Sequence, residues 1–181
     1  MPQLYFLPGR GSSFDGRLGK ELQSRGYGLE GRVLEGDFAK LPFPDQIDLI
    51  ADDLGTHSKQ RTPLIAHSFG AYLGLHAILQ NNGYAGKVLL ISPILGAVKG
   101  NGRMFIPPQS KRISEAIGSR QFPKLDSVLL VGDQDWQTPL AECENLVNRL
   151  NGKLHVARGR GHDLGANTVQ TLLNNFFNGS P

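Results

Sequence analysis

The chain has 181 residues, of which 39% are hydrophobic, and a formal net charge of +3. This length suits one domain with its own hydrophobic core, so we expect a single domain over residues 1–181. The small, scattered positive charge argues against a nucleic-acid-binding protein, and the lone Cys143 excludes an internal disulfide.

Strand and helix patterns alternate along the sequence. Short apolar runs predict strands at residues 3–7, 29–34, 62–67, 87–92, 127–131 and 153–157. Helical spacing of apolar residues predicts helices at 14–25, 44–57, 71–80, 139–150 and 164–177, with a shorter one near 109–117. This alternation predicts an α/β fold, a three-layer α/β/α sandwich with a mostly parallel six-stranded sheet, whose functional site lies beyond the carboxyl ends of the strands.

One segment, at about 93–125, interrupts the alternation. It is rich in glycine and proline and contains only the short helical pattern. We interpret it as a small cap-like excursion from the domain. Met104 and Phe105 are candidates for an apolar wall of a substrate pocket, although packing onto the core is the commoner role for such residues.

Ser68 lies between an apolar run and an amphipathic pattern, in the order A-x-S-x-G formed by Ala66, Ser68 and Gly70. A sharp turn from strand to helix at this point would expose the hydroxyl and aim the next backbone N–H at a developing oxyanion. The pattern therefore predicts a nucleophile. The pentapeptide alone is also compatible with an ordinary helix cap.

A nucleophilic serine needs a base and an acid that orients the base. Asp135 ends the polar turn Gly-Asp-Gln-Asp after the run at 127–131, and His162 lies on a glycine-flanked loop after the run at 153–157. Both should face the same sheet edge as Ser68. We predict His162 as the base and Asp135 as its partner, while Asp133 is assigned to stabilising the turn.

The order Ser68, Asp135, His162, with these three motifs, resembles the α/β-hydrolases over nearly the whole chain. The resemblance implies hydrolysis of a carboxylic ester or thioester through an acyl-enzyme on Ser68, without a cofactor. It also implies an oxyanion hole made by the backbone N–H groups of Phe69 and Arg10. Pro8 stands where the family commonly has a histidine, a change that leaves the backbone donor in place.

Other residues at this edge are candidates for substrate contact. Gly9 would let the backbone approach a ligand closely, and Trp136, beside the acid, would line the mouth of the site or cover the core. Loop arginines such as Arg10 would suit an anionic substrate, although solvated arginines are common at such places. No metal site is expected, because the remaining histidines lack acidic or cysteine neighbours at ligand spacing.

The sequence contains no signal-peptide pattern and no apolar run long enough to span a bilayer. We therefore expect a cytoplasmic protein whose partner is a small-molecule ester or thioester, and neither nucleic acid nor a membrane. The sequence does not indicate the oligomeric state.

Two other functions remain open at this point. Residues 9–14 resemble a G-x-G-x-x-G loop without its third glycine, which would indicate a nucleotide-binding oxidoreductase. A non-catalytic protein with a hydrolase-like fold is the other alternative, because a fold does not determine a function.

Overall fold

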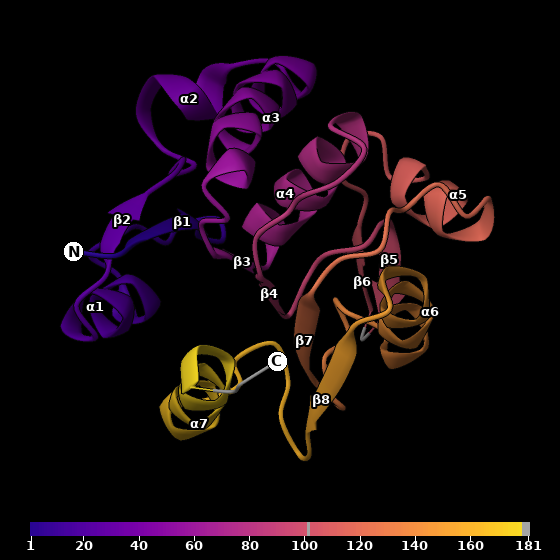
Figure 1. The fold of residues 1–181 in the computed structure, drawn as a ribbon. Coiled ribbons are helices and arrows are strands. Elements are labelled where there is room, and N and C mark those ends of the chain that lie inside the picture. Colours follow the sequence, from indigo (N-terminus) through magenta and orange to yellow (C-terminus); the bar gives the residue numbers. More distant parts are fainter. Residues whose placement is uncertain (101, 179–181) are drawn as a thin grey trace.

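The computed structural model of the chain describes residues 1–100 and 102–178. Its main sheet has six strands, β1 (Gln3–Leu7), β2 (Gly28–Glu30), β3 (Leu64–His67), β4 (Val88–Ile91), β7 (Ser127–Gly132) and β8 (Lys153–Ala157). Their order is β2-β1-β3-β4-β7-β8, and every neighbouring pair is parallel (Figure 1). The predicted three-layer α/β/α sandwich is confirmed.

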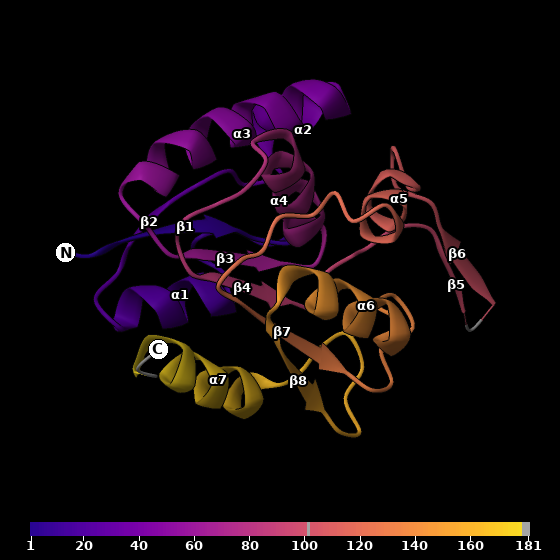
Figure 2. The same cartoon turned by 45° about the vertical axis from the view of Figure 1, so that its right-hand side comes forward.

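Helices cover both faces of this sheet (Figure 2). One face carries α1 (Arg17–Ser24) and α7 (Ala166–Asn178). The other carries α2 (Gly36–Lys40), α3 (Phe43–Lys59), α4 (Phe69–Gln80), α5 (Arg112–Gly118) and α6 (Leu140–Leu150). Because the central strands are covered on both faces, they read as continuous apolar runs rather than as an alternating pattern.

The second strand is shorter than the prediction of 29–34. It ends at Glu30, because Gly31 adopts φ 144° and a Cβ at that position would overlap the carbonyl oxygen of Phe6. The chain leaves the sheet there and forms α2, a short helix that the apolar pattern did not indicate. The positive φ at Gly31 is a conformation that glycine adopts without steric cost.

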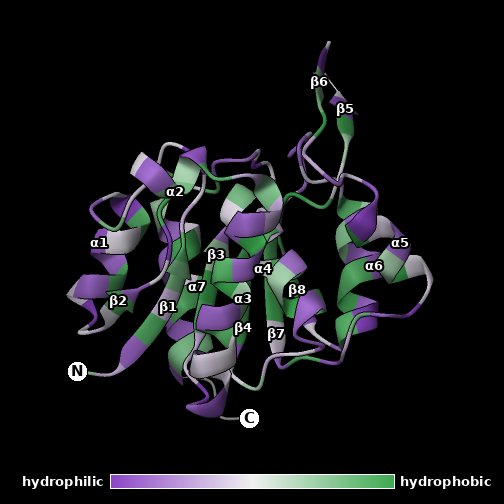
Figure 3. Cartoon of the chain, turned by 90° about the horizontal axis from the view of Figure 1, so that it is seen from above, coloured by the Kyte–Doolittle hydropathy of each residue, from purple (hydrophilic) through white to green (hydrophobic). Residues whose placement is uncertain are grey.

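The 93–125 segment divides into two parts. The antiparallel hairpin β5 (Val98–Gly100) and β6 (Arg103–Phe105) stands out from the body of the molecule (Figure 3). Helix α5 instead packs beside α6 and buries Ile113 and Ala116 in the core. Only the hairpin therefore has the form of an excursion, and α5 belongs to the helical layer.

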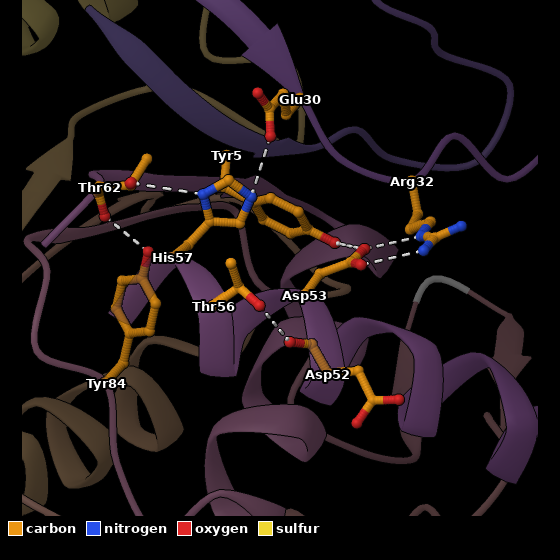
Figure 4. A network of polar contacts seen from close by, with 9 residues as sticks. All are labelled: Tyr5, Glu30, Arg32, Asp52, Asp53, Thr56, His57, Thr62 and Tyr84. Carbon is orange, nitrogen blue, oxygen red and sulfur yellow. Dashed lines mark hydrogen bonds and ion pairs between the residues drawn. The ribbon is translucent and has the colours of Figure 1, made fainter. Parts of the chain in front are cut away.

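A polar network attaches the segment after β2 to the body (Figure 4). Asp53 of α3 accepts hydrogen bonds from the Tyr5 hydroxyl at 2.7 Å and from Arg32 Nε and Nη2 at 2.7 and 3.0 Å. Burial and the nearby Asp53 carboxylate raise the pKa of Tyr5 above its usual range, so its hydroxyl stays a donor. The bidentate Arg32–Asp53 pair fixes the exit of the edge strand.

The same network contains a buried histidine in α3. His57 Nδ1 lies 3.3 Å from the Thr62 hydroxyl oxygen, and its Nε2 lies 3.2 Å from Glu30 Oε2. The Tyr84 hydroxyl donates to the Thr62 carbonyl at 2.6 Å. These contacts join α3, β2 and the residues that precede β3, at the end of β3 opposite to Ser68.

The strand order reverses direction between β1 and β3. From β1 the chain crosses through α1 to β2 at one edge, whereas from β3 it crosses through α4 to β4 on the other side. The loops that follow β1 and β3 therefore lead to helices on opposite faces of the sheet (Figure 2). A crevice between such loops is where open parallel sheets place their ligands.

Candidate active site

Ser68 occupies the turn between β3 and α4 in a conformation that few serines adopt. Its φ is 53° and its ψ is −118°, and its N–H donates to the Ile91 carbonyl at 2.9 Å. Gly70 makes the turn possible, because a Cβ there would overlap the carbonyl oxygens of Leu7 and Pro8. The turn is thus pressed against the end of β1, with Ser68 itself half-buried at the sheet edge.

The predicted base and acid meet Ser68 in one chain of hydrogen-bond contacts. His162 Nε2 lies 2.9 Å from Ser68 Oγ, and His162 Nδ1 lies 2.8 Å from Asp135 Oδ2. Asp135 is buried, and its other oxygen accepts the Gln137 N–H at 2.9 Å. A carboxylate in this position favours the tautomer with the proton on Nδ1, which leaves Nε2 free to accept the serine proton.

The loop that carries His162 is held against the end of β7. A Cβ on Gly132 would overlap the carbonyl oxygens of Arg160 and Gly161, so the glycine permits this close passage. Asp133 accepts the Gly159 N–H at 2.7 Å. Asp133 therefore has the structural role expected of it, but it binds the histidine loop rather than its own turn.

Ser92 is a site residue that sequence reasoning missed. It is fully buried, has φ 42°, and its Oγ donates to the His162 carbonyl oxygen at 3.3 Å. It follows β4 directly, just as Ser68 follows β3, and its N–H donates to the Leu130 carbonyl at 2.8 Å. Its place after a strand at the same sheet edge was the available signal. Ser92 contacts the backbone of the histidine and not its ring, so we assign it a positioning role.

The residues predicted for the oxyanion hole, Phe69 and Arg10, follow Ser68 and Gly9 in the chain and contact each other. Phe69 is the first residue of α4, so its N–H is one of those that a helix leaves without an internal acceptor. Gly9 packs so closely that a Cβ there would be 3.1 Å from Ser68 Cβ. Arg10 follows directly, and its guanidinium carbon lies 3.9 Å from the centre of the Phe69 ring. The start of the glycine loop, at Gly9 and Arg10, therefore lies beside Ser68 and Phe69.

The three other candidates for substrate contact differ in position. Phe105 packs edge-on toward the Phe69 ring with 6.3 Å between ring centres, and Trp136 packs against Gly100 of the hairpin. Met104 is 67% exposed, which corrects the expectation that it forms a pocket wall. The reason is the alternation of side chains along β6: Phe105 faces the body, so Met104 faces solvent.

His67, which precedes the nucleophile, lies on the face of the sheet that carries α1 and α7. Its ring centre is 5.9 Å from that of His162, and a Cβ on Gly9 would be 3.1 Å from its Nδ1. Burial, followed by the nearby His162, lowers the pKa of His67 to about 4. His67 is therefore neutral near pH 7, and Ser68 Oγ has His162 as its imidazole partner.

Within residues 1–100 and 102–178, no group of three His, Cys, Asp or Glu side chains is arranged to hold a metal ion. No helix in that part of the chain has both the length and the apolar character needed to cross a bilayer.

No protein-family model matches the sequence, and no curated protein matches it either. Solved structures do match the fold. A "predicted CIB-like hydrolase" from Thermoplasma acidophilum has a TM-score of 0.69 and 13% identity, covering 97% of this chain and 86% of that one. A monoacylglycerol lipase from Paleococcus ferrophilus has a TM-score of 0.67 and 16% identity, with 98% and 95% covered. The chain therefore has the fold of the α/β-hydrolases.

Proposed function

We propose that this protein is a serine hydrolase that cleaves a carboxylic ester or thioester through an acyl-enzyme on Ser68. The observation that carries the proposal is the line of contacts from Asp135 through His162 to Ser68, at 2.8 and 2.9 Å. These residues lie at the carboxyl edge of the main sheet. The fold of the chain is similar to that of a monoacylglycerol lipase. The second support is the strand-to-helix turn at Ser68, where a φ of 53° places the serine directly before the N-terminus of α4.

The first half of the reaction transfers the acyl group to the protein. Ser68 Oγ bonds to the carbonyl carbon while its proton passes to His162 Nε2, and the carbonyl π electrons move onto oxygen. The N–H groups of Phe69 and Arg10 are the proposed donors to that oxyanion. When the carbonyl re-forms, the bond to the leaving oxygen or sulfur breaks with its electron pair, and the leaving atom takes the proton from His162.

The second half repeats these steps with water as the nucleophile. Water gives a proton to His162 Nε2 and bonds to the acyl carbon, and Ser68 Oγ then leaves and recovers that proton. Buried Asp135 stabilises the imidazolium that forms in each half. The products are a carboxylic acid and an alcohol or thiol, and the chain returns to its starting protonation state.

The test is turnover of p-nitrophenyl acetate by the wild-type protein and by Ser68→Ala. We expect the variant to lose activity by a factor of about 10⁴ to 10⁶, because the serine and histidine act as a unit. Ser114→Ala, on the exposed side of α5, is the matched control and should keep full activity. Thermal melting checks that both variants are folded. Undiminished turnover in folded Ser68→Ala, or no turnover by the wild type, would overturn the proposal.

A further inference from the structure

A cavity of about 260 Å³ lies between α1 and α7, on the His67 face of the sheet. Figure 2 shows these two helices side by side on that face. Its apolar wall consists of Leu18, Ile91, Leu164 and Val169, and both His67 and His162 contribute to its lining. Its size is just below the range of about 300–1,000 Å³ that is usual for small-molecule sites, so it suits part of a substrate rather than a whole large one.

The cavity contacts only some of the residues that are proposed to act in acyl transfer. Its lining includes His162 but not Ser68, and neither Phe69 nor Arg10, the two proposed oxyanion donors. In acyl transfer the departing oxygen or sulfur takes its proton from the histidine, so the leaving group must lie beside that ring. The carbonyl oxygen lies instead beside the oxyanion donors. The cavity borders His162, the residue that would protonate the leaving group, and not the proposed oxyanion donors.

The charges around the cavity are paired. Arg17 and Asp163 form an ion pair at 2.8 Å, with side chains 66% and 72% exposed. Glu21 pairs with Arg25 at 2.8 Å and also accepts a hydrogen bond from Gln170 of α7 at 3.0 Å. Each charged side chain of the lining has a partner of opposite charge. A charged ligand would therefore gain little binding free energy there, and a neutral apolar group would lose little.

We propose that this cavity binds the alcohol or thiol part of the substrate and selects a compact, uncharged, apolar leaving group. The inference rests on the proposed function, and it names the substrate feature that the sequence left open. Arg17 and Asp163 both line the cavity, and their ion pair links α1 to the His162 loop beside it.

The test fills the cavity without disturbing the core. Ala166, the first residue of α7, is exposed and contributes to the lining, so an indole in Ala166→Trp would occupy part of the space. Ala141→Trp is the matched control, because Ala141 is also exposed in the first turn of a helix but lies on α6, across the sheet. Fluorophosphonate labelling of Ser68 counts the competent molecules in each preparation.

Two series of esters separate the two sides of the reaction. In one, acetate is joined to phenol, 4-methylphenol or 4-tert-butylphenol, so that only the bulk of the leaving group changes. In the other, phenol is joined to acetate, butyrate or hexanoate. In Ala166→Trp we expect kcat/KM for the 4-tert-butylphenyl ester to fall by about tenfold or more relative to the phenyl ester, with the acyl-series ratios kept within about twofold. Ala141→Trp should follow the wild type in both series.

The outcomes are distinct. If Ala166→Trp alters the acyl series, or leaves the leaving-group series unchanged, the assignment of the cavity is wrong even though the wild type is labelled and active. If the wild type shows neither labelling at Ser68 nor turnover, the proposed function fails and this inference fails with it.

Discussion

Strand β3 has a hydroxyl, an imidazole and a carboxylate near each of its two ends. At the carboxyl end are Ser68, His162 and Asp135, and just before the amino end are Thr62, His57 and Glu30. The distances from hydroxyl to imidazole are 2.9 and 3.3 Å, respectively. The two sets thus contain the same chemical groups in contact, and Figure 4 shows the second of them.

The surroundings of the two hydroxyls differ. Thr62 is 5% exposed and lies before the strand, whereas Ser68 is half-buried, has φ 53° and is followed by the N-terminus of α4. The acids differ in the opposite sense: the Glu30 side chain is 53% exposed and that of Asp135 is 0% exposed. The two sets therefore share residue types and contacts but differ in their surroundings. The strand-to-helix turn, access for a substrate and a buried acid distinguish the proposed site.

Removing the two carboxylates separately gives the largest expected contrast. Asp135→Asn keeps the shape of the acid but favours the wrong histidine tautomer, so we expect kcat for p-nitrophenyl acetate to fall by about 10⁴-fold. Glu30→Gln, at the other end of β3, should leave kcat within about twofold, because Glu30 contacts His57 there and not the groups around Ser68. Equal losses in the two variants would mean that the regions are not functionally distinct.

The two carboxylate variants must be compared at a pH at which the protein is folded. His76 of α4 limits how low that pH can be. It is fully buried between Phe43 and Tyr72, and neither ring nitrogen has a hydrogen-bond partner among the described residues. Burial, with a smaller effect of Arg112, lowers the pKa of His76 from 6.5 to about 3. The unfolded chain therefore binds a proton that the folded chain excludes, and stability falls as the pH drops from 6.5 toward 3.

We expect His76 to account for a loss on the order of 4 kcal/mol across that interval, at about 1.4 kcal/mol per pKa unit. In His76→Phe the free energy of unfolding, measured with urea at each pH, should fall less steeply over the same range. His67, whose pKa is also lowered, contributes in the same direction and keeps some pH dependence in the variant. Identical pH profiles for the variant and the wild type would contradict this assignment.

Substitution of two glycines in α4 tests how tightly the turn at Ser68 is packed. A Cβ at Gly70 would overlap the backbone of Leu7 and Pro8, so Gly70→Ala should cost about 3 kcal/mol or more in stability. At Gly74 the nearest atom to a new Cβ is Leu7 Cδ1 at 3.2 Å, the end of a flexible side chain. Gly74→Ala should change stability by less than about 1 kcal/mol, because helix propensity offsets the contact. Urea unfolding of both variants measures these changes, and equal losses would mean that the turn at Ser68 is not tightly packed against the end of β1.

The layers of the fold were predictable because long amphipathic and apolar patterns dominate them. The strands at 3–7 and 153–157 were predicted with the bounds that the structure has. The predictions that failed concern short segments. Strand β2 ends before Gly31, whose backbone contacts that of Phe6. The β5–β6 hairpin and α2 are too short to show a clear hydrophobic period.

For the site, the sequence motifs predicted the three side chains that meet. Each motif follows a strand, and parallel strands bring their carboxyl ends to one edge of the sheet. Ser92 and the cavity between α1 and α7 were not predictable in the same way. Ser92 contacts a backbone carbonyl, and the cavity lies between two helices that are far apart in sequence.

The most direct test of the account is covalent labelling by a fluorophosphonate, which reacts with activated serines and not with ordinary hydroxyls. Intact mass and peptide mapping should show one adduct per chain, on Ser68, with Thr62 unmodified. Labelling should disappear in His162→Ala, because the hydroxyl then has no base. An unlabelled wild-type protein, or an adduct that persists in Ser68→Ala, would contradict the claim that the turn after β3 holds an activated nucleophile.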